Sequence, residues 1–276
     1  MNPTHRRRWL GRALAAVMLL ATGPAFAHSG TGPHNYGHSA LGGLRIGVVR
    51  SGTPFAYRRD GEPRGFEVDL ARAVAAEMAI PFTLRWMKRE AALAALGAGD
   101  IDLAIGGVLE GPPPPALDRV PYLVVGEHVM VRRDNPFGVH AADDLSGTMV
   151  VATMKSGGAR FAESLAGAIA ESGRAPMEVH RSPRAAYTPV AVLFAHAAAY
   201  FAPSAAAALQ SVGPDARAKP VAGLFAPEGA LGFVFPTAAF ELKRDLKLAL
   251  AQVVAKGEYA RLLAAYAIPP DCSPFR

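Results

Sequence analysis

A pair of glycines after an apolar run marks the first place where this sequence could hold a small ligand. Gly106 and Gly107 end the stretch DIDLAIGG, and glycines at a strand end let the backbone approach a bound molecule closely. Glu110, three residues further on, would place a carboxylate at the mouth of such a site. A tight turn and an ordinary surface carboxylate explain the same residues without any ligand.

The second candidate is the start of a helical pattern. Lys155 precedes Ser156, Gly157 and Gly158, and the unpaired backbone amides of a helix N-terminus attract anions. The lysine would add positive charge to such a site. Capping of the helix by Ser156 and solvation of Lys155 are the alternatives that require no ligand.

Three histidines near the N-terminus form the candidate metal site. Cleavage of a signal peptide after Ala27 would expose the amine of His28 beside its imidazole, a chelate suited to Cu(II), and His34 or His38 could add a nitrogen. A disordered polar tail is the alternative, so we expect weak copper or zinc binding at most. The sequence contains no HExxH, GxSxG or P-loop pattern, and its other histidines are scattered. We therefore expect no enzymatic activity.

The N-terminal segment indicates an exported protein. The first residues, HRRRWLGRALAAVMLLA, combine a basic segment with a short apolar run, and Ala25-Phe26-Ala27 fits a signal-peptidase site. The formal charge of +6 falls to +2 without the four arginines of that segment, so no nucleic-acid partner is expected. These features predict a periplasmic protein. The single cysteine, Cys272, lies in a proline-rich tail and is expected to be an inert, mobile thiol.

Periodicity predicts an α/β fold with two lobes. The first part alternates strand, helix, strand, helix and strand, which is typical of a parallel sheet with helices on its faces. A second alternation follows, and two strongly periodic helices end the chain. The expected elements are strands 44–49, 81–86, 100–107, 127–134, 148–153, 177–180, 198–202 and 230–236, and helices 67–78, 89–99, 156–172, 186–196 (interrupted at Pro189), 203–211, 238–257 and 258–267.

These residues resemble a known family. The stretches LRIGVVRSGTPFAYRRDGEPRGFEVDLARAVAAEM, AALAALGAGDIDLAIGG and VPYL are similar to the bacterial family-3 solute-binding proteins, the periplasmic amino-acid receptors of ABC importers. The resemblance covers nearly all of residues 44–268. It implies the type II periplasmic binding fold, in which two parallel-sheet lobes joined by a hinge close on a small solute.

The resemblance also implies the domain organisation and an aromatic wall. Phe55 and Tyr57 match aromatic residues that line the family's cleft, although ordinary core packing is the alternative. Glu67 and Asp69 are interpreted as residues of a first helical turn. The expected organisation is a signal peptide (1–27), a flexible linker (28–43), lobe 1 (44–127), lobe 2 (128–224) and a return to lobe 1 (225–276), with hinges near 127–134 and 222–229.

Two charges of the family's amino-acid clamp are missing. Counting back from Pro121 places Pro112 where relatives carry the arginine that grips a ligand carboxylate, and Arg119 has the wrong spacing. Pro203 takes the place of the aspartate that pairs with the ligand ammonium. The sequence therefore predicts a ligand other than a standard α-amino acid.

Two functions remain open at this point. The first is a solute-binding protein whose partners are a small molecule and ABC transporter membrane subunits. The alternative is an adaptor with the same fold that docks on a periplasmic dehydrogenase or cytochrome, such as a quinoprotein methanol dehydrogenase system. In that alternative the four prolines from Pro112 to Pro115 form a rigid, partner-facing segment at the mouth of the cleft.

Overall fold

The computed structural model describes residues 43–107, 111–194, 196–213 and 216–275, which belong to one compact unit. The predicted signal peptide, most of the linker, the three N-terminal histidines and Glu110 lie outside the described residues. None of the helices in the described part combines the length and apolar character needed to cross a bilayer.

The predicted strand and helix alternation of lobe 1 is confirmed. Parallel strands β1, β4 and β5 form one end of a single eight-stranded sheet, with β1 in the middle of the three. Because parallel strands are buried on both faces, β1 is a nearly continuous apolar run. The elements are β1 (Leu44–Val49), α1 (Phe66–Glu77), β4 (Phe82–Met87), α2 (Arg89–Ala98) and β5 (Leu103–Gly106), with a small hairpin of β2 (Tyr57–Arg59) and β3 (Glu62–Arg64) before α1.

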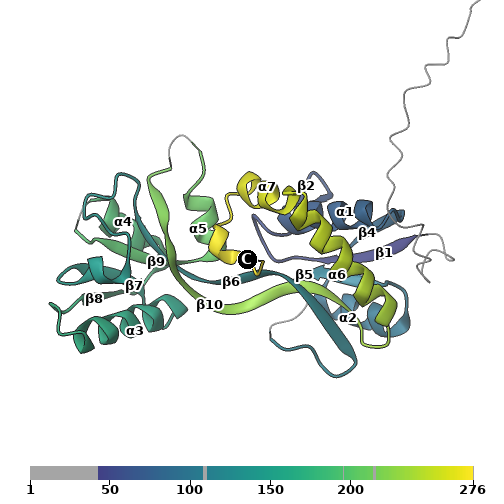
Figure 1. Ribbon diagram of the computed structural model, residues 1–276, viewed down its shortest axis with the longest axis horizontal. Coiled ribbons are helices and arrows are strands. Elements are labelled where there is room, and N and C mark those ends of the chain that lie inside the picture. The colour runs from purple at the N-terminus through teal and green to yellow at the C-terminus, as the bar shows by residue number, and fades with distance from the viewer. Residues whose placement is uncertain (1–42, 108–110, 195, 214–215, 276) are drawn as a thin grey trace, which may run out of the picture. The chain divides into compact units, whose positions relative to one another are not determined.

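Two long antiparallel strands join the lobes. The sheet order is β4-β1-β5-β10-β6-β9-β7-β8, so that β6 (Leu117–Arg132) and β10 (Ala218–Pro236) lie at its centre (Figure 1). The sequence predicted only part of each strand, 127–134 and 230–236. The two proposed hinge segments face each other in this ladder, where Glu127 is opposite Ala226 and the register shifts between Pro220 and Phe225. These bulges interrupt the regular pairing where the chain passes between the lobes.

Lobe 2 repeats the parallel arrangement with β9, β7 and β8. Pro189 lies in the first turn of α4 and does not interrupt the helix, because the first turn has no intrahelical donor to lose. The elements are β7 (Met149–Thr153), α3 (Gly157–Glu171), β8 (Glu178–Ser182), α4 (Thr188–Leu193), β9 (Ala199–Pro203) and α5 (Ser204–Gln210).

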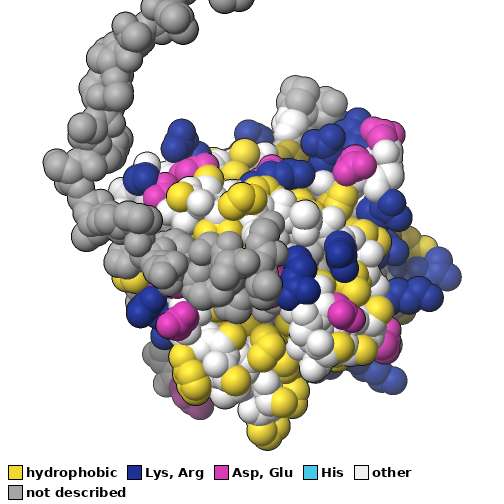
Figure 2. All heavy atoms as spheres, turned by 90° about the vertical axis from the view of Figure 1, so that its right-hand side faces the viewer, with side chains coloured by type: hydrophobic (Ala, Val, Ile, Leu, Met, Phe, Trp, Pro, Cys, Tyr) yellow, Lys and Arg dark blue, Asp and Glu magenta, His cyan; other side chains and the backbone are white. Residues whose placement is uncertain are grey.

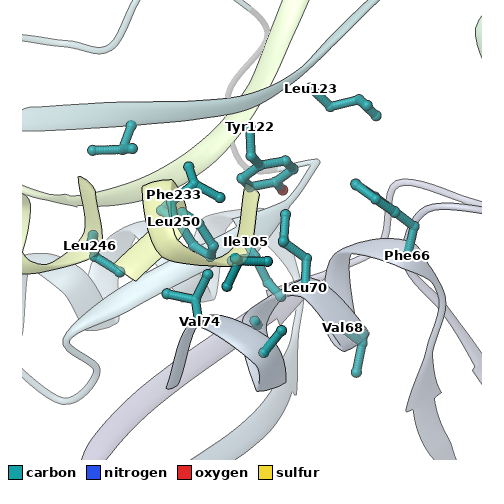
Figure 3. Close-up of a cluster of buried hydrophobic side chains, with 14 of the residues drawn as sticks. Phe66, Val68, Leu70, Val74, Ile105, Tyr122, Leu123, Phe233, Leu246 and Leu250 are labelled. Carbon is teal, nitrogen blue, oxygen red and sulfur yellow. The ribbon is translucent and has the colours of Figure 1, made fainter. Parts of the chain in front are cut away.

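The core of lobe 1 draws on both ends of the described chain. Helices α6 (Phe240–Ala255) and α7 (Glu258–Ala265) pack on α1. Figure 3 shows side chains from α1, β5, β6, β10 and α6 meeting in one apolar cluster. Burying each large aliphatic side chain contributes roughly 1.5–3 kcal/mol, so the returning helices are needed to complete this core. The labelled members are Phe66, Val68, Leu70, Val74, Ile105, Tyr122, Leu123, Phe233, Leu246 and Leu250.

The expectation of a mobile C-terminal thiol was wrong. Cys272 ends the short 3-10 helix η4 (Pro270–Cys272) and is fully buried. Burial raises the pKa of this thiol to about 11, with a smaller opposing effect of the Ser204 hydroxyl. The sequence did not reveal this packing because the tail has no periodicity. Cys272 is held by His128 and Ser204, which are far away in the chain.

Candidate functional site

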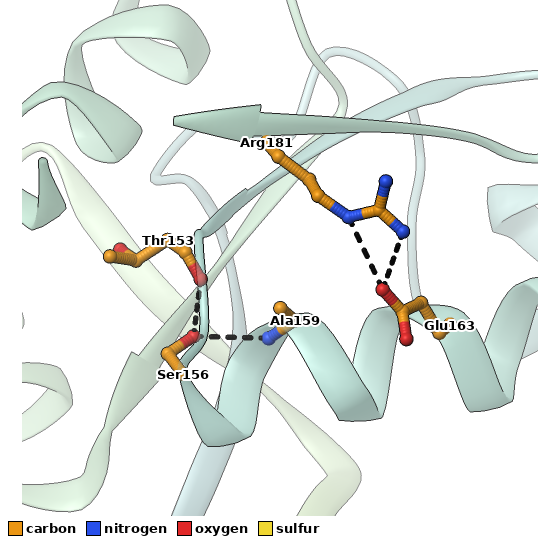
Figure 4. Close-up of polar contacts among 5 residues, drawn as sticks. All are labelled: Thr153, Ser156, Ala159, Glu163 and Arg181. Carbon is orange, nitrogen blue, oxygen red and sulfur yellow. Dashed lines mark hydrogen bonds and ion pairs between the residues drawn. The ribbon is translucent and has the colours of Figure 1, made fainter. Parts of the chain in front are cut away.

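The start of α3 has the capping geometry that the sequence allowed. The Ser156 hydroxyl accepts a hydrogen bond from the Ala159 amide (3.1 Å) and donates one to the Thr153 carbonyl (2.7 Å), as Figure 4 shows. The preceding Lys155 is exposed and has a positive φ of 59°. Ser156 therefore serves as the N-cap, and its hydroxyl is already used by the chain itself.

The N-terminus of α3 faces two carboxylates of the crossing strands. Glu127, on β6, is only 6% exposed and accepts a hydrogen bond from the Gly158 amide. A Cβ on Gly158 would lie 3.2 Å from Glu127 Oε2, and one on Gly157 would lie 1.9 Å from Glu228 Oε1. Two of the protein's own acidic side chains thus lie beside the glycines of the anion site predicted at Ser156-Gly157-Gly158.

Electrostatics explains this arrangement. The partial positive charge of the helix N-terminus stabilises a nearby carboxylate. Burial raises the pKa of Glu127, the neighbouring Glu228 raises it further, and the hydrogen bond from Gly158 opposes both effects. Arg160 offsets part of the negative charge of these two carboxylates, because its Nη2 lies 2.9 Å from Glu228 Oε1.

A surface pocket adjoins these groups. It has a volume of about 660 Å³ and lies between the first turns of α3 and the bulged part of β10. Its lining combines cationic, anionic and aromatic side chains, which suits a polar small molecule. The lining residues are Gly157, Arg160, Phe161, Ser164, Ala226, Pro227 and Glu228.

Gly106 and Gly107 are required by close backbone packing. A Cβ on Gly106, whose φ is 91°, would lie 1.9 Å from the Val49 carbonyl oxygen, and one on Gly107 would lie 2.6 Å from that of Arg50. The Gly107 carbonyl accepts a hydrogen bond from Arg89 Nε (2.9 Å). These contacts support the tight-turn interpretation of both glycines.

The two candidate aromatic residues differ in environment. Phe55 is 5% exposed and belongs to the lobe 1 core, so packing accounts for it. Tyr57 begins β2 and is half-buried. Core packing is therefore sufficient to account for Phe55, and the aromatic wall of Phe55 and Tyr57 stays a prediction.

Sequence reasoning missed that the carboxylate at the start of α1 is buried. Glu67 lies in the first turn of α1, as predicted, but it is only 1% exposed and accepts hydrogen bonds from the hydroxyls of Ser51 and Tyr122. Burial raises the pKa of Glu67 to about 7, against the lowering effect of these two hydrogen bonds. The sequence signal was present only as an acidic residue within an apolar helical run.

The prolines do not lie at the hinge end of the sheet. Pro112 and Pro115 are exposed, and Thr237 donates a hydrogen bond to the Pro115 carbonyl (3.0 Å), which fixes this segment where β6 begins and β10 ends. Leu117 and Glu127 are ten residue steps apart on β6, so ~33 Å of strand separates this segment from the hinge. The segment therefore lies away from the hinge, and the partner-facing role of these prolines stays a prediction.

Pro203 is exposed at the end of β9, and its register partner on β6 is Glu127. The Glu127 carboxylate therefore lies on the strand adjacent to position 203, directly across the ladder from it. Glu127 carried no sequence signal, because it stood inside a segment interpreted only as an extended crossing.

Comparisons with known proteins agree with this architecture. The family model of bacterial extracellular solute-binding proteins, family 3, matches residues 44–268. The "Probable amino-acid-binding protein YxeM" of Bacillus subtilis (strain 168) is 27% identical over 44% of this chain and 46% of its own length. The L-cystine-binding protein TcyJ of Escherichia coli (strain K12) is 30% identical over 40% of this chain and 42% of its own length. The alignments thus span less than half of these curated relatives.

Two solved structures share the fold. A polar amino acid ABC uptake transporter substrate binding protein from Streptococcus thermophilus has a TM-score of 0.65 and 18% identity, over 83% of this chain and 88% of that one. An ancestral cyclohexadienyl dehydratase has a TM-score of 0.67 and 20% identity, over 87% of this chain and 98% of that one. With the family model covering most of the sequence, the chain belongs to the bacterial extracellular solute-binding proteins, family 3.

Proposed function

We propose that this family-3 protein is a periplasmic receptor for a small solute that does not present a free carboxylate to α3, and hence is not a standard α-amino acid. The observation that carries the proposal is the Glu127 carboxylate at the N-terminus of that helix. Pro203, at the predicted position of the acidic clamp residue, supports it.

A like-charge argument gives the size of the effect. Two unit charges about 4 Å apart at an effective dielectric constant of about 20 repel by ~4 kcal/mol. A ligand carboxylate placed beside an ionised Glu127 would lose roughly a thousandfold in affinity. A neutral or cationic group at the same place would not incur this penalty.

The proposed mechanism is closure about the β6–β10 crossing, without catalysis. A ligand that contacts both lobes binds the closed form better and therefore shifts the population toward it. The bulged register around Pro220–Phe225 supports bending at this point, because fewer ladder hydrogen bonds resist it. The proposed partners are the small molecule and ABC transporter membrane subunits. Weak copper or zinc binding by His28, His34 and His38 stays a prediction.

A calorimetric ligand panel tests the proposal. The mature protein is titrated with amino acids, amines and polyamines, organic acids and sugars. We expect saturable binding among compounds that lack an α-carboxylate, and we expect the standard amino acids to be weak. A standard amino acid that binds the wild-type protein at micromolar concentration would overturn the proposal.

A matched pair of variants makes the test specific to the helix N-terminus. Glu127→Gln keeps the size and the acceptor oxygen of the side chain but removes its charge, so binding of carboxylate ligands should improve. Glu62→Gln removes a carboxylate from the exposed strand β3 and should leave the ligand profile unchanged. Identical profiles for Glu127→Gln and wild type would contradict the role assigned to Glu127.

A further inference from the structure

A buried polar cluster lies at the junction of the two crossing strands. His128 Nε2, on β6, is 3.1 Å from the Ser204 hydroxyl at the start of α5 and 3.5 Å from the Cys272 sulfur. All three side chains are almost completely buried. The Ser204 hydroxyl also accepts from the Gly126 amide (3.0 Å) and donates to the Gly126 carbonyl (3.1 Å), which ties α5 to β6.

The C-terminal tail reaches both crossing strands. Helix η4 contacts β6 and β10, and the end of the described chain lies over these strands in Figure 1. Asp271 accepts hydrogen bonds from the Gly223 amide on β10 (3.1 and 3.4 Å), while its neighbour Cys272 packs against His128 on β6. The tail is therefore a bridge between the two strands that join the lobes.

The contact on β10 falls where that strand is irregular. Gly223 lies inside the register shift between Pro220 and Phe225 and has a φ of 79°. Its amide bonds to Asp271, so the tail supplies an acceptor within the shifted stretch. The Phe225 ring stacks on His128 with the centroids 4.5 Å apart, which places both strands against the same buried cluster.

The far end of the tail is anchored in lobe 1. The Phe275 ring meets that of Tyr259 edge to face, with the centroids 5.0 Å apart. The Tyr259 hydroxyl donates a hydrogen bond to the Tyr122 carbonyl of β6 (2.6 Å). The tail is thus held in lobe 1 on one side and at the crossing on the other.

We propose that residues 269–275 form a strap that restrains bending between the lobes, and that release of this strap exposes the Cys272 thiol. Any bend at the register shift changes the separation of His128 and Gly223, which the strap spans. The lobes can therefore move freely only when the Asp271 and Cys272 contacts are broken.

The single cysteine of the chain makes strap release directly measurable. The full mature chain is treated with a chromogenic disulfide reagent under native conditions. The wild-type protein should react far more slowly than it does in denaturant. Asp271→Ala should accelerate the native reaction roughly tenfold, because it removes hydrogen bonds to a charged group. Asp60→Ala, at an exposed turn, is the matched control and should leave the rate unchanged.

Hydrogen exchange tests whether the strap restrains the crossing. A chain ending at Ile268, or Phe275→Ala if that truncated chain does not fold, should exchange faster in residues 124–130 and 221–229 than wild type. Peptides from β1 and β4 should be unchanged. Equal exchange in the crossing segments, or acceleration of all peptides alike, would overturn the proposal. So would an Asp271→Ala labelling rate equal to that of wild type.

Discussion

The Glu127 carboxylate lies against Gly158, and the absence of a side chain on that glycine allows the approach. A Cβ at position 158 would be 3.2 Å from Glu127 Oε2 and 2.6 Å from Phe201 Cβ. The Glu127 carboxylate therefore reaches the amides of α3 only because the helix begins with glycines, which have no side chain.

Gly158→Ala should destabilise the protein. The new methyl would overlap Phe201, a buried core residue that cannot simply rotate away, and overpacking of this kind costs about 1–3 kcal/mol. Gly167→Ala is the control on the same helix. Its Cβ meets nothing within 4 Å, and alanine should stabilise that helix by up to ~1 kcal/mol. Chemical denaturation measures both changes, and equal stabilities of the two variants would contradict the packing argument.

Glu67 should make the protein less stable as the pH rises. Its folded-state pKa of about 7 lies above the ordinary value of 4.5, so its full contribution is present below pH 4.5 and is lost as the pH rises through 7. The shift corresponds to ~3 kcal/mol. Glu67→Gln, which stays neutral, should remove this loss.

The measurement for Glu67 is the free energy of unfolding from pH 4 to 8. The difference between wild type and Glu67→Gln should change across this range, whereas Glu62→Gln on the exposed strand β3 should follow wild type. Parallel curves for wild type and Glu67→Gln would mean that Glu67 does not titrate in this window.

His128 should have the opposite effect. Burial lowers its pKa to about 4, against a smaller opposing effect of Asp271. Its contribution to stability is therefore complete above pH 6.5 and is lost as the pH falls through 4. His128→Gln keeps a hydrogen-bonding side chain but cannot be protonated, so it should reduce the loss of stability in acid. His140→Gln is the control at an exposed site.

The pH ranges over which Glu67 and His128 change the free energy of unfolding overlap between pH 4.5 and 6.5. In this range their effects on stability have opposite signs. The wild-type protein should show a shallower pH dependence in this range than either variant alone. A Glu67→Gln curve that rises less steeply with pH than the wild-type curve would contradict the assignment.

Local periodicity was sufficient for most of the fold. The apolar spacing of α1 and the short apolar run of β1 each depend on neighbouring residues, and both elements appear where the sequence predicts them. The full lengths of β6 and β10 were missed, because their proline and glycine residues interrupt any simple pattern although the long ladder tolerates them at bulges.

The candidate site and the buried polar clusters were harder to predict, because their contacts are distant in sequence. Ser204 and Cys272 lie 76 and 144 residues from His128, and no spacing rule links them. In the sequence, Glu67 has the pattern of an ordinary first-turn residue. Its burial becomes evident only in the structure, where the Ser51 and Tyr122 hydroxyls bind its carboxylate. Gly157 and Gly158 were singled out as an anion site, but the sequence could not show that carboxylates of the protein would lie against them.

The discontinuous construction of lobe 1 has a consequence for the newly made chain. The lobe 2 core is complete once residue 224 has been synthesised, whereas the lobe 1 core still lacks Leu246, Leu250 and Val253 at that moment. The order of maturation is therefore inverted relative to the order of translation. The first half of the polypeptide keeps an unfilled apolar surface until the last helices emerge, and this interval is when a holding chaperone has most to protect.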